Sequence, residues 1–208
     1  MDPNVWGPKL WDTIILCTYR LSTEESLLLF KAMTELIPCS HCLNSYKFFY
    51  NKLSPEKYTG GPEKWIWTIH DMVNQKLGKH GAPFSRIDAR YKAFTHPVSV
   101  YDVFDILIII ATQVKTNESL QAFKSIIPLY KQLIRPTEFS EFLTLPNDDV
   151  TELTLWIHLL DCKNNFHVKV GEERVSRENA IVQYFDSQPQ INVEKIKPKS
   201  RRSGRKRL

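Results

Sequence analysis

Apolar residues recur at helical spacing through most of this chain, and this spacing constrains its fold more than any other feature. In residues 6–20, one stripe of an expected helix carries Leu10, Trp11, Ile14, Ile15, Thr18 and Tyr19. The same pattern, interrupted by proline and glycine, predicts further helices over residues 23–36, 39–50, 63–77 and 85–93. We therefore expect an all-α fold.

Three local features predict where these helices begin and end. The segment Thr23-Glu24-Glu25-Ser26 offers a cap for the second helix. Pro38 interrupts that helix, and we expect the third to begin within residues 39–42. Gly78 is well placed to end the fourth, because glycine accepts the left-handed conformation that follows many helices.

The second half of the chain also favours helices, near residues 100–114, 118–134, 149–160 and 176–185. Its apolar faces suffice for a helical domain, and they carry Tyr101, Phe104, Leu107, Ile108, Phe123, Ile127, Tyr130, Leu153, Trp156 and Leu159. The alternation in Phe166-His167-Val168-Lys169-Val170 is typical of a short strand.

Pro97 marks a boundary between two parts of the chain. We expect a first domain at residues 1–97 and a second, mostly helical domain at 98–187, which serves packing, dimerisation or substrate selection. Residues 188–208 have no apolar periodicity and are expected to be a disordered basic tail.

Glycine-rich nucleotide-binding loops are absent from the sequence. The chain has only seven glycines, and it contains neither G-x-G-x-x-G nor G-x-x-x-x-G-K-[ST]. A nucleotide cofactor would therefore have to be held by side chains.

The main chemical motif is Cys39-Ser40-His41-Cys42. At the start of a helix, the free amides and the helix dipole stabilise a thiolate at the first cysteine, and His41 can add positive charge. Stabilising the reduced form makes such a pair a stronger oxidant. The alternative is half of a zinc site, completed by a histidine such as His41, His70, His80 or His96, but no second paired element is present.

Of the other two cysteines, Cys17 lies on the apolar stripe of the first helix and Cys162 ends an apolar helix, and both are expected to pack as buried thiols. A second polar pair, His70 and Asn74, is four residues apart and so shares one helix face. Taken alone, that pair favours a core contact with the backbone over a ligand site.

Four elements in order carry a resemblance to a known family. They are Trp6-Gly7-Pro8-x-x-Trp11, then Pro38-Cys39-x-x-Cys42, then Trp65 followed by His70-Asp71-x-Val73-Asn74-x-x-Leu77-Gly78-Lys79, and finally Arg90-Tyr91. Across residues 5–95 the chain resembles the Erv/ALR sulfhydryl oxidases, and most closely the versions carried by large DNA viruses. The resemblance implies a four-helix bundle with a short fifth helix, a bound FAD and a homodimer.

The resemblance also implies roles for individual residues. Cys39 would exchange with substrate, and Cys42 would lie against the isoalloxazine and deliver electrons to it. The cofactor-binding residues implied are Trp11 and Tyr19 near the flavin, His70 and Asn74 at the adenine and ribose, Leu77 in the same element, Lys79 and Arg90 at the phosphates, and Tyr91, which would stack where the family usually has Trp.

The sequence departs from the family pattern at several positions. Ile15 stands where the family has His, Asp71 stands where it has Asn, and Trp67 stands where a structural disulfide would have a cysteine. An acid near phosphates would repel them, so we expect Asp71 to point elsewhere or to bond to Lys or Arg. The shuttle disulfide of many cellular members is also absent, so substrate thiols would reach Cys39 directly or through a partner redox protein.

The expected function is therefore an enzyme, an FAD-dependent thiol oxidase. It would form disulfides in protein substrates and pass electrons through the cysteine pair to flavin and then to O2, giving H2O2. The first alternative is a non-enzymatic scaffold or assembly protein of the same fold. The second is a nucleic-acid-binding module, because residues 195–208 hold eight Lys or Arg and no acid, while the rest of the chain has a net charge of −3.

The resemblance and the composition also predict location. The start of the chain lacks the basic and apolar regions of a secretory signal, and its longest apolar run is too short to span a bilayer. We expect a protein of the host cytoplasm or the virion that is not secreted and has no membrane partner, with nuclear entry through the basic tail as an alternative.

Overall fold

The computed structural model describes residues 3–93, 100–133, 141, 143–144 and 152–170. Its elements are α1 (Pro3–Thr18), α2 (Thr23–Leu36), α3 (Ser40–Lys52), a single 3-10 turn η1 (Pro55–Lys57), α4 (Gly61–Lys76), α5 (Phe84–Ala93), α6 (Val100–Ala111), α7 (Asn117–Leu133) and α8 (Glu152–Val170). Within these ranges the chain forms helices and no strand, so the predicted all-α fold is confirmed. In the same ranges, no helix combines the length and the apolar character needed to cross a membrane.

The local sequence explains where α2 and α4 begin or end. Ser22 caps α2: its Oγ accepts from the Glu25 amide at 3.2 Å, and its own amide donates to the Glu25 carboxylate at 2.9 Å. The cap thus lies one residue before the predicted segment. Gly78 follows α4 with φ +67°, as predicted, and the Lys79 amide then donates to the Asn74 carbonyl at 2.8 Å. This turn fixes the chain beside the last turn of α4.

The predicted short strand at Phe166–Val170 is wrong, because these residues form the last turns of α8. Five alternating residues are too few to separate a strand from a helix end. The helix expected at 176–185 and the tail at 188–208 lie outside the described residues, as do the side chains of Tyr101, Leu153 and Trp156.

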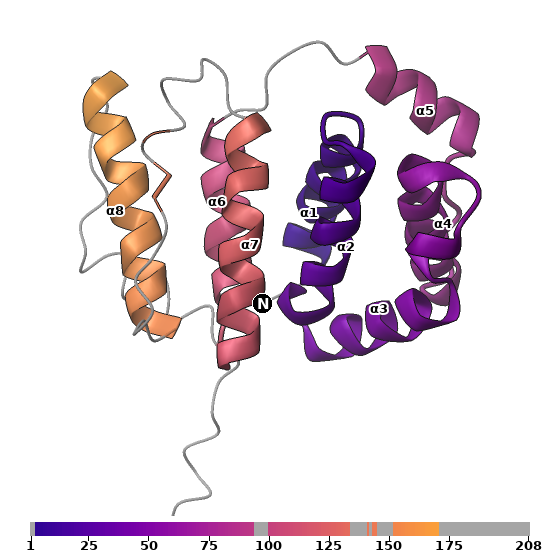
Figure 1. Cartoon of the computed structure of the whole chain (residues 1–208), viewed down its shortest axis with the longest axis horizontal. Coiled ribbons are helices and arrows are strands. Elements are labelled where there is room, and N and C mark those ends of the chain that lie inside the picture. The colour runs from indigo at the N-terminus through magenta and orange to yellow at the C-terminus, as the bar shows by residue number, and fades with distance from the viewer. Residues whose placement is uncertain (1–2, 94–99, 134–140, 142, 145–151, 171–208) are drawn as a thin grey trace, which may run out of the picture.

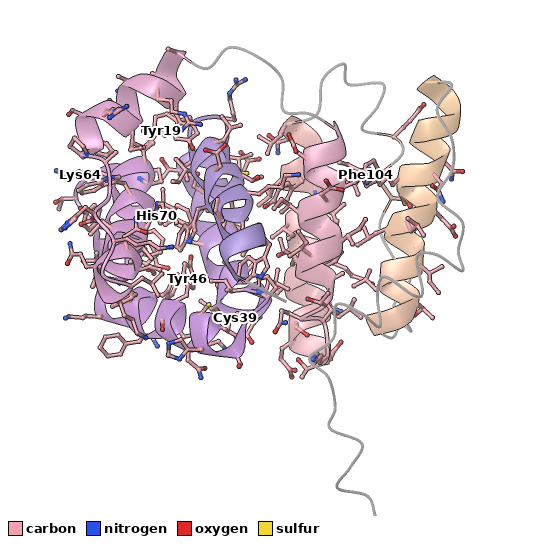
Figure 2. All side chains as sticks on the ribbon, turned by 180° about the vertical axis from the view of Figure 1, so that it is seen from behind. Tyr19, Cys39, Tyr46, Lys64, His70 and Phe104 are labelled. Carbon is pink, nitrogen blue, oxygen red and sulfur yellow. The ribbon has the colours of Figure 1, made fainter. Side chains whose placement is uncertain are left out.

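The helices form two groups that lie side by side (Figure 1). In the first group, α1 and α2 lie next to α4, α3 crosses one end and α5 crosses the other. The second group consists of α6, α7 and α8. Its helix α7 packs on α2 of the first group, and α8 packs on α6. Phe104, fully buried, lies between α6 and α8 (Figure 2).

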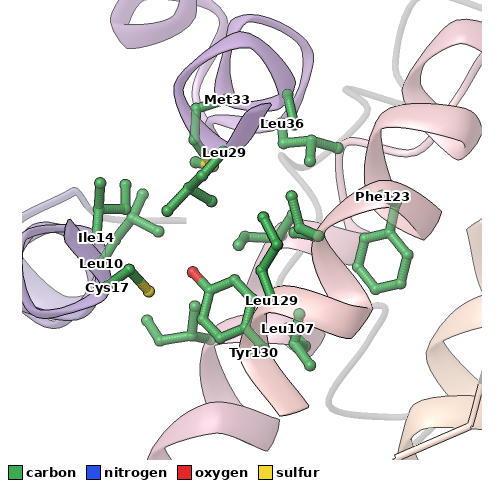
Figure 3. Close-up of a cluster of buried hydrophobic side chains, with 14 of the residues drawn as sticks. Leu10, Ile14, Cys17, Leu29, Met33, Leu36, Leu107, Phe123, Leu129 and Tyr130 are labelled. Atoms are coloured by element: carbon green, nitrogen blue, oxygen red, sulfur yellow. The ribbon is translucent and has the colours of Figure 1, made fainter. Parts of the chain in front are cut away.

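One continuous hydrophobic core joins the two groups. Figure 3 shows side chains from α1, α2, α6 and α7 turned toward one another, including Leu10, Ile14, Cys17, Leu29, Met33, Leu36, Leu107, Phe123, Leu129 and Tyr130. Each of these is 3% exposed or less. The apolar face of α7 therefore has its partner in α1 and α2.

Charged side chains also link the two groups. The Lys9 ammonium of α1 lies 2.9 Å from Asp102 and 3.1 Å from Asp105 of α6, and Lys163 of α8 lies 2.8 Å from Asp105. Burial works to raise the pKa of Asp105, but hydrogen bonds from Lys163 and Lys9 outweigh it and leave that pKa lowered. Because these pairs are partly exposed, they fix the register of the three helices more than they stabilise them.

Two buried tyrosines allow a matched test of this core. The Tyr46 hydroxyl donates to the Phe30 carbonyl at 3.1 Å, whereas the Tyr130 hydroxyl has no hydrogen-bond partner among the described residues. An unpaired buried hydroxyl costs free energy, so we expect Tyr130→Phe to raise the free energy of unfolding by about 1–2 kcal/mol. Tyr46→Phe should lower it by about 1 kcal/mol, because it removes a buried hydrogen bond. Urea titrations measure both, and equal shifts in the same direction would contradict the assignment.

Candidate active site

The cysteine pair sits at the N-terminus of α3, as the sequence predicts. Cys39 is the N-cap residue, in an extended conformation, and Cys42 lies in the first turn. The Cys42 amide points at the Cys39 sulfur at 3.3 Å, and the two sulfurs are 2.7 Å apart. The pair is thus close enough for disulfide exchange, with a backbone donor directed at Cys39.

The two sulfurs have different surroundings. Cys42 lines a cavity, and Cys39 does not. Burial, and secondarily the hydrogen bond with Cys39, raises the pKa of the Cys42 thiol to about 12, while the nearby charge of Lys76 acts in the opposite direction. Cys42 in the dithiol pair therefore stays protonated at neutral pH, and the Cys39 sulfur is the one that faces the Cys42 amide.

The cavity has a volume of about 350 Å³ and lies between α1, α3, α4 and α5. It is lined by Trp6, Gly7, Pro8, Leu10, Trp11, Asp12, Ile14, Ile15, Ile37, His41, Cys42, Ser45, Tyr46, His70, Val73, Asn74, Lys76, Leu77, Lys79, Ile87, Arg90 and Tyr91. Most of this wall is apolar or aromatic, with polar groups contributed by α1, α3, α4, α5 and the turn that follows α4. A pocket of this size and character suits a planar organic ligand.

Trp11 and His70 stack against each other inside this wall, with ring centroids 4.6 Å apart and planes 21° apart. Burial lowers the pKa of His70, so its ring is neutral at pH 7. Within the described part of the chain, neither the His70 ring nor the side-chain amide of Asn74 forms a hydrogen bond with another residue. The sequence had favoured a core pair bonded to the backbone, and that interpretation is wrong, because both side chains line the cavity with their hydrogen-bonding groups available.

Three cationic side chains lie along the same wall. Lys76 donates to the Ser45 hydroxyl at 2.6 Å, and Arg90 lies 3.3 Å from the Asp12 carboxylate, which also accepts from the Tyr91 hydroxyl. Lys79 is exposed and lines the cavity from the turn after α4. The cavity therefore has an apolar floor with positive charge at its edge.

Two of the residues named from the sequence lie elsewhere. Tyr19 does not line the cavity; its ring stacks on Tyr91 at 5.6 Å, and its hydroxyl donates to Asp88 at 3.1 Å. Tyr19 thus supports a wall residue instead of meeting a ligand directly. Asp71 is also outside the lining, as expected, but it accepts from Gln75 at 2.6 Å and, among the residues described, not from a Lys or Arg.

Three polar residues of the cavity were not predicted from the sequence: Asp12, Ser45 and Lys76. Ser45 lies one helical turn after Cys42, so helical spacing alone could have placed it on the same face. Asp12 and Lys76 carry no such pattern, since both meet the cavity only through the packing of α1 and α4 on α3 and α5.

The remaining cysteines differ from each other. Cys17 is 0% exposed, and burial raises the pKa of its thiol far above the usual range. Cys162 is also buried, but it contacts polar side chains, so the prediction that it only fills space was incomplete. In the residues that the structure describes, no three His, Cys, Asp or Glu side chains are grouped so as to hold a metal ion.

No protein-family model matches the chain, and neither any curated protein nor any solved structure matches it significantly. The residues and their geometry are therefore the basis for assigning a function.

Proposed function

We propose that the chain is an FAD-dependent thiol oxidase of the Erv/ALR type, which forms disulfides in protein substrates and passes the electrons to O2, giving H2O2. One observation carries this proposal: of two adjacent sulfurs, only that of Cys42 lines a cavity with an aromatic floor and a cationic edge. A redox pair placed between substrate and cofactor needs this asymmetry, because its two sulfurs serve different partners.

The residues present fit FAD. Its planar ring system suits the apolar and aromatic wall, and His70 and Asn74 have hydrogen-bonding groups available for a ligand. Lys76, Lys79 and Arg90 offer positive charge for the two phosphates. Leu77 is 59% exposed at the cavity edge, and a bound cofactor would cover part of it. When bound, the flavin supplies a two-electron acceptor.

The chain's own chemistry is thiol–disulfide exchange. In the oxidised pair, a substrate thiolate attacks the Cys39 sulfur, because that sulfur lies outside the cavity. The Cys39–Cys42 bond breaks, a mixed disulfide forms at Cys39, and Cys42 leaves as a thiolate beside the charge of Lys76. A second substrate thiolate then attacks the mixed disulfide, releasing an oxidised substrate and the Cys39 thiolate. The pair has thereby gained two electrons, held next to the cofactor cavity.

The finer architecture belongs to the same proposal. We assign α1, α2, α3 and α4 as the four-helix bundle and α5 as the short fifth helix, with the cavity at one mouth of the bundle. The proposed homodimer must leave α7 in place on α2, so its interface would lie on other surfaces of the chain.

The second candidate, a non-enzymatic scaffold, shares the fold but needs no redox cofactor. The visible spectrum of the purified full-length chain separates the two. We expect a bound-flavin spectrum that bleaches when a dithiol is added without oxygen and returns when oxygen is admitted, with one peroxide formed per dithiol oxidised. A colourless protein that does not take up added FAD would sink the oxidase proposal, and a bound flavin unaffected by dithiol would favour the scaffold.

A further inference from the structure

Cys162 belongs to a small polar cluster at α8, a helix that α6 and α7 separate from α3 and its cysteine pair (Figure 1). Its sulfur lies 3.7 Å from Nε2 of His158, one turn earlier on α8, and 3.5 Å from the Thr144 hydroxyl. The same His158 nitrogen lies 3.2 Å from both the hydroxyl and the carbonyl oxygen of Thr144. Because a carbonyl only accepts, Nε2 carries a proton, and it can share that proton with the sulfur.

These contacts favour a thiolate. Burial works to raise the pKa of Cys162, but hydrogen bonds from His158 and Thr144 outweigh it, and the pKa is lowered. The hydrogen bond to Cys162 raises the pKa of His158, and Asp161 adds to this effect. The next charged neighbour, Lys163, is held by Asp105 of α6 at 2.8 Å. Within the described part of the chain Cys17 has no such side-chain partners, and its pKa moves the other way.

Access to the sulfur is limited by size. Cys162 is only 5% exposed, but Thr144 is exposed and His158 is half-buried. So small an exposed area favours a small neutral molecule over a protein thiol as the reagent for this sulfur. Among thiol reagents of biological chemistry, hydrogen peroxide meets this limit, and thiolates are the form that it attacks.

We infer that Cys162, His158 and Thr144 form a second reactive-thiol site, at which hydrogen peroxide oxidises Cys162 to a sulfenic acid. The Cys162 thiolate attacks one peroxide oxygen, an S–O bond forms, and the O–O bond breaks. The sulfur loses two electrons to the peroxide, and the His158 imidazolium gives its Nε2 proton to the leaving hydroxide, which departs as water. The site is independent of the proposed function, since peroxide from any source would react; an oxidase would only make its own supply.

The test is a time course of the full-length chain with added peroxide and a dione that traps sulfenic acids. Trypsin places Cys17, the Cys39–Cys42 pair and Cys162 on three different peptides, so mass spectrometry reads each site separately. We expect Cys162 to be labelled at least about tenfold faster than Cys17. Labelling of Cys162 no faster than that of Cys17 would overturn the proposal, whatever the flavin content or oxidase activity of the protein.

Two variants test the roles of the neighbours. His158→Gln should slow the labelling of Cys162 by about tenfold and move the pH profile of its alkylation by iodoacetamide to higher pH, because the thiolate loses its cationic partner. Thr144→Val should have a smaller effect. The Cys17 rate reports on folding in both variants. An unchanged Cys162 rate and pH profile in a folded His158→Gln protein would refute the pairing, and if that variant unfolds, Thr144→Val and the wild-type comparison still decide.

Discussion

Replacing Cys42 with serine is expected to abolish thiol-dependent oxygen consumption while the purified protein keeps its bound flavin. The serine hydroxyl fills nearly the same space in the cavity wall, so cofactor binding should survive. It cannot form a disulfide with Cys39, so turnover with dithiothreitol should fall by about 10³-fold or more. An oxygen electrode measures the rate, and absorbance of the same sample measures the flavin content.

Two further variants show whether the effect is specific to the pair. Cys39→Ser should be equally inactive, whereas Cys162→Ala, which changes a thiol far from the cavity, should keep its oxygen consumption. Dithiol turnover in Cys42→Ser at the wild-type rate would rule out the proposed route.

The same two serine variants should differ in what they trap. Cys42→Ser keeps the sulfur that lies outside the cavity, so Cys39 should form a lasting mixed disulfide with an activated thiol such as a thionitrobenzoate adduct. Of the pair, Cys39→Ser keeps only Cys42, whose sulfur lies in the cavity wall, and this sulfur should react much more slowly. Equal labelling of both variants would contradict the different roles assigned to Cys39 and Cys42.

The sequence predicted the helices well because their ends depend on neighbouring residues. Pro38 ends α2 and Cys39 caps α3, while Gly78 adopts the positive φ that ends α4. Each of these is a local effect of side-chain hydrogen bonding or backbone freedom. The strand expected at residues 166–170 was wrong because a five-residue pattern was interpreted by itself. These residues are the end of a long helix, α8, that begins well before them.

The packing of the second group of helices on the first could not be predicted in this way. The apolar stripe of α7 shows that this helix has a buried face, but nothing in the stripe says that α2 covers it. That choice depends on how side chains such as Leu29, Met33 and Leu129 fit together in space (Figure 3).

For the candidate site too, the sequence predicted features within one helix but not the contacts between helices. Residues of one helix, such as His70 and Asn74, could be placed on one face from their spacing. The stacking of Trp11 on His70, the pairing of Asp12 with Arg90 and the absence of Tyr19 from the cavity wall each depend on how separate helices meet. A linear pattern does not contain these distances.

A fragment of residues 1–97 is expected to fail as an independent soluble domain. Without α7, the faces of α1 and α2 that carry Cys17, Leu29 and Met33 lose their cover (Figure 3). Each large apolar side chain left exposed costs about 1.5–3 kcal/mol, and a few of them match the whole stability of a small domain, about 5–15 kcal/mol. We expect aggregation or self-association by light scattering, where a fragment of residues 1–170 behaves like the full-length chain. A monomeric 1–97 fragment that melts cooperatively near the full-length temperature would contradict this.

The same truncation should also weaken cofactor binding, because α1 takes part in both structures. Leu10 and Ile14 line the cavity and also belong to the core that α7 completes. Loss of α7 therefore loosens the wall that carries Trp11, even though no cavity residue is deleted. Refolded 1–97 protein should retain less flavin per chain than the 1–170 fragment at equal added FAD. Equal retention would show that the cavity is held by the first five helices alone, and that the second group only covers an apolar face.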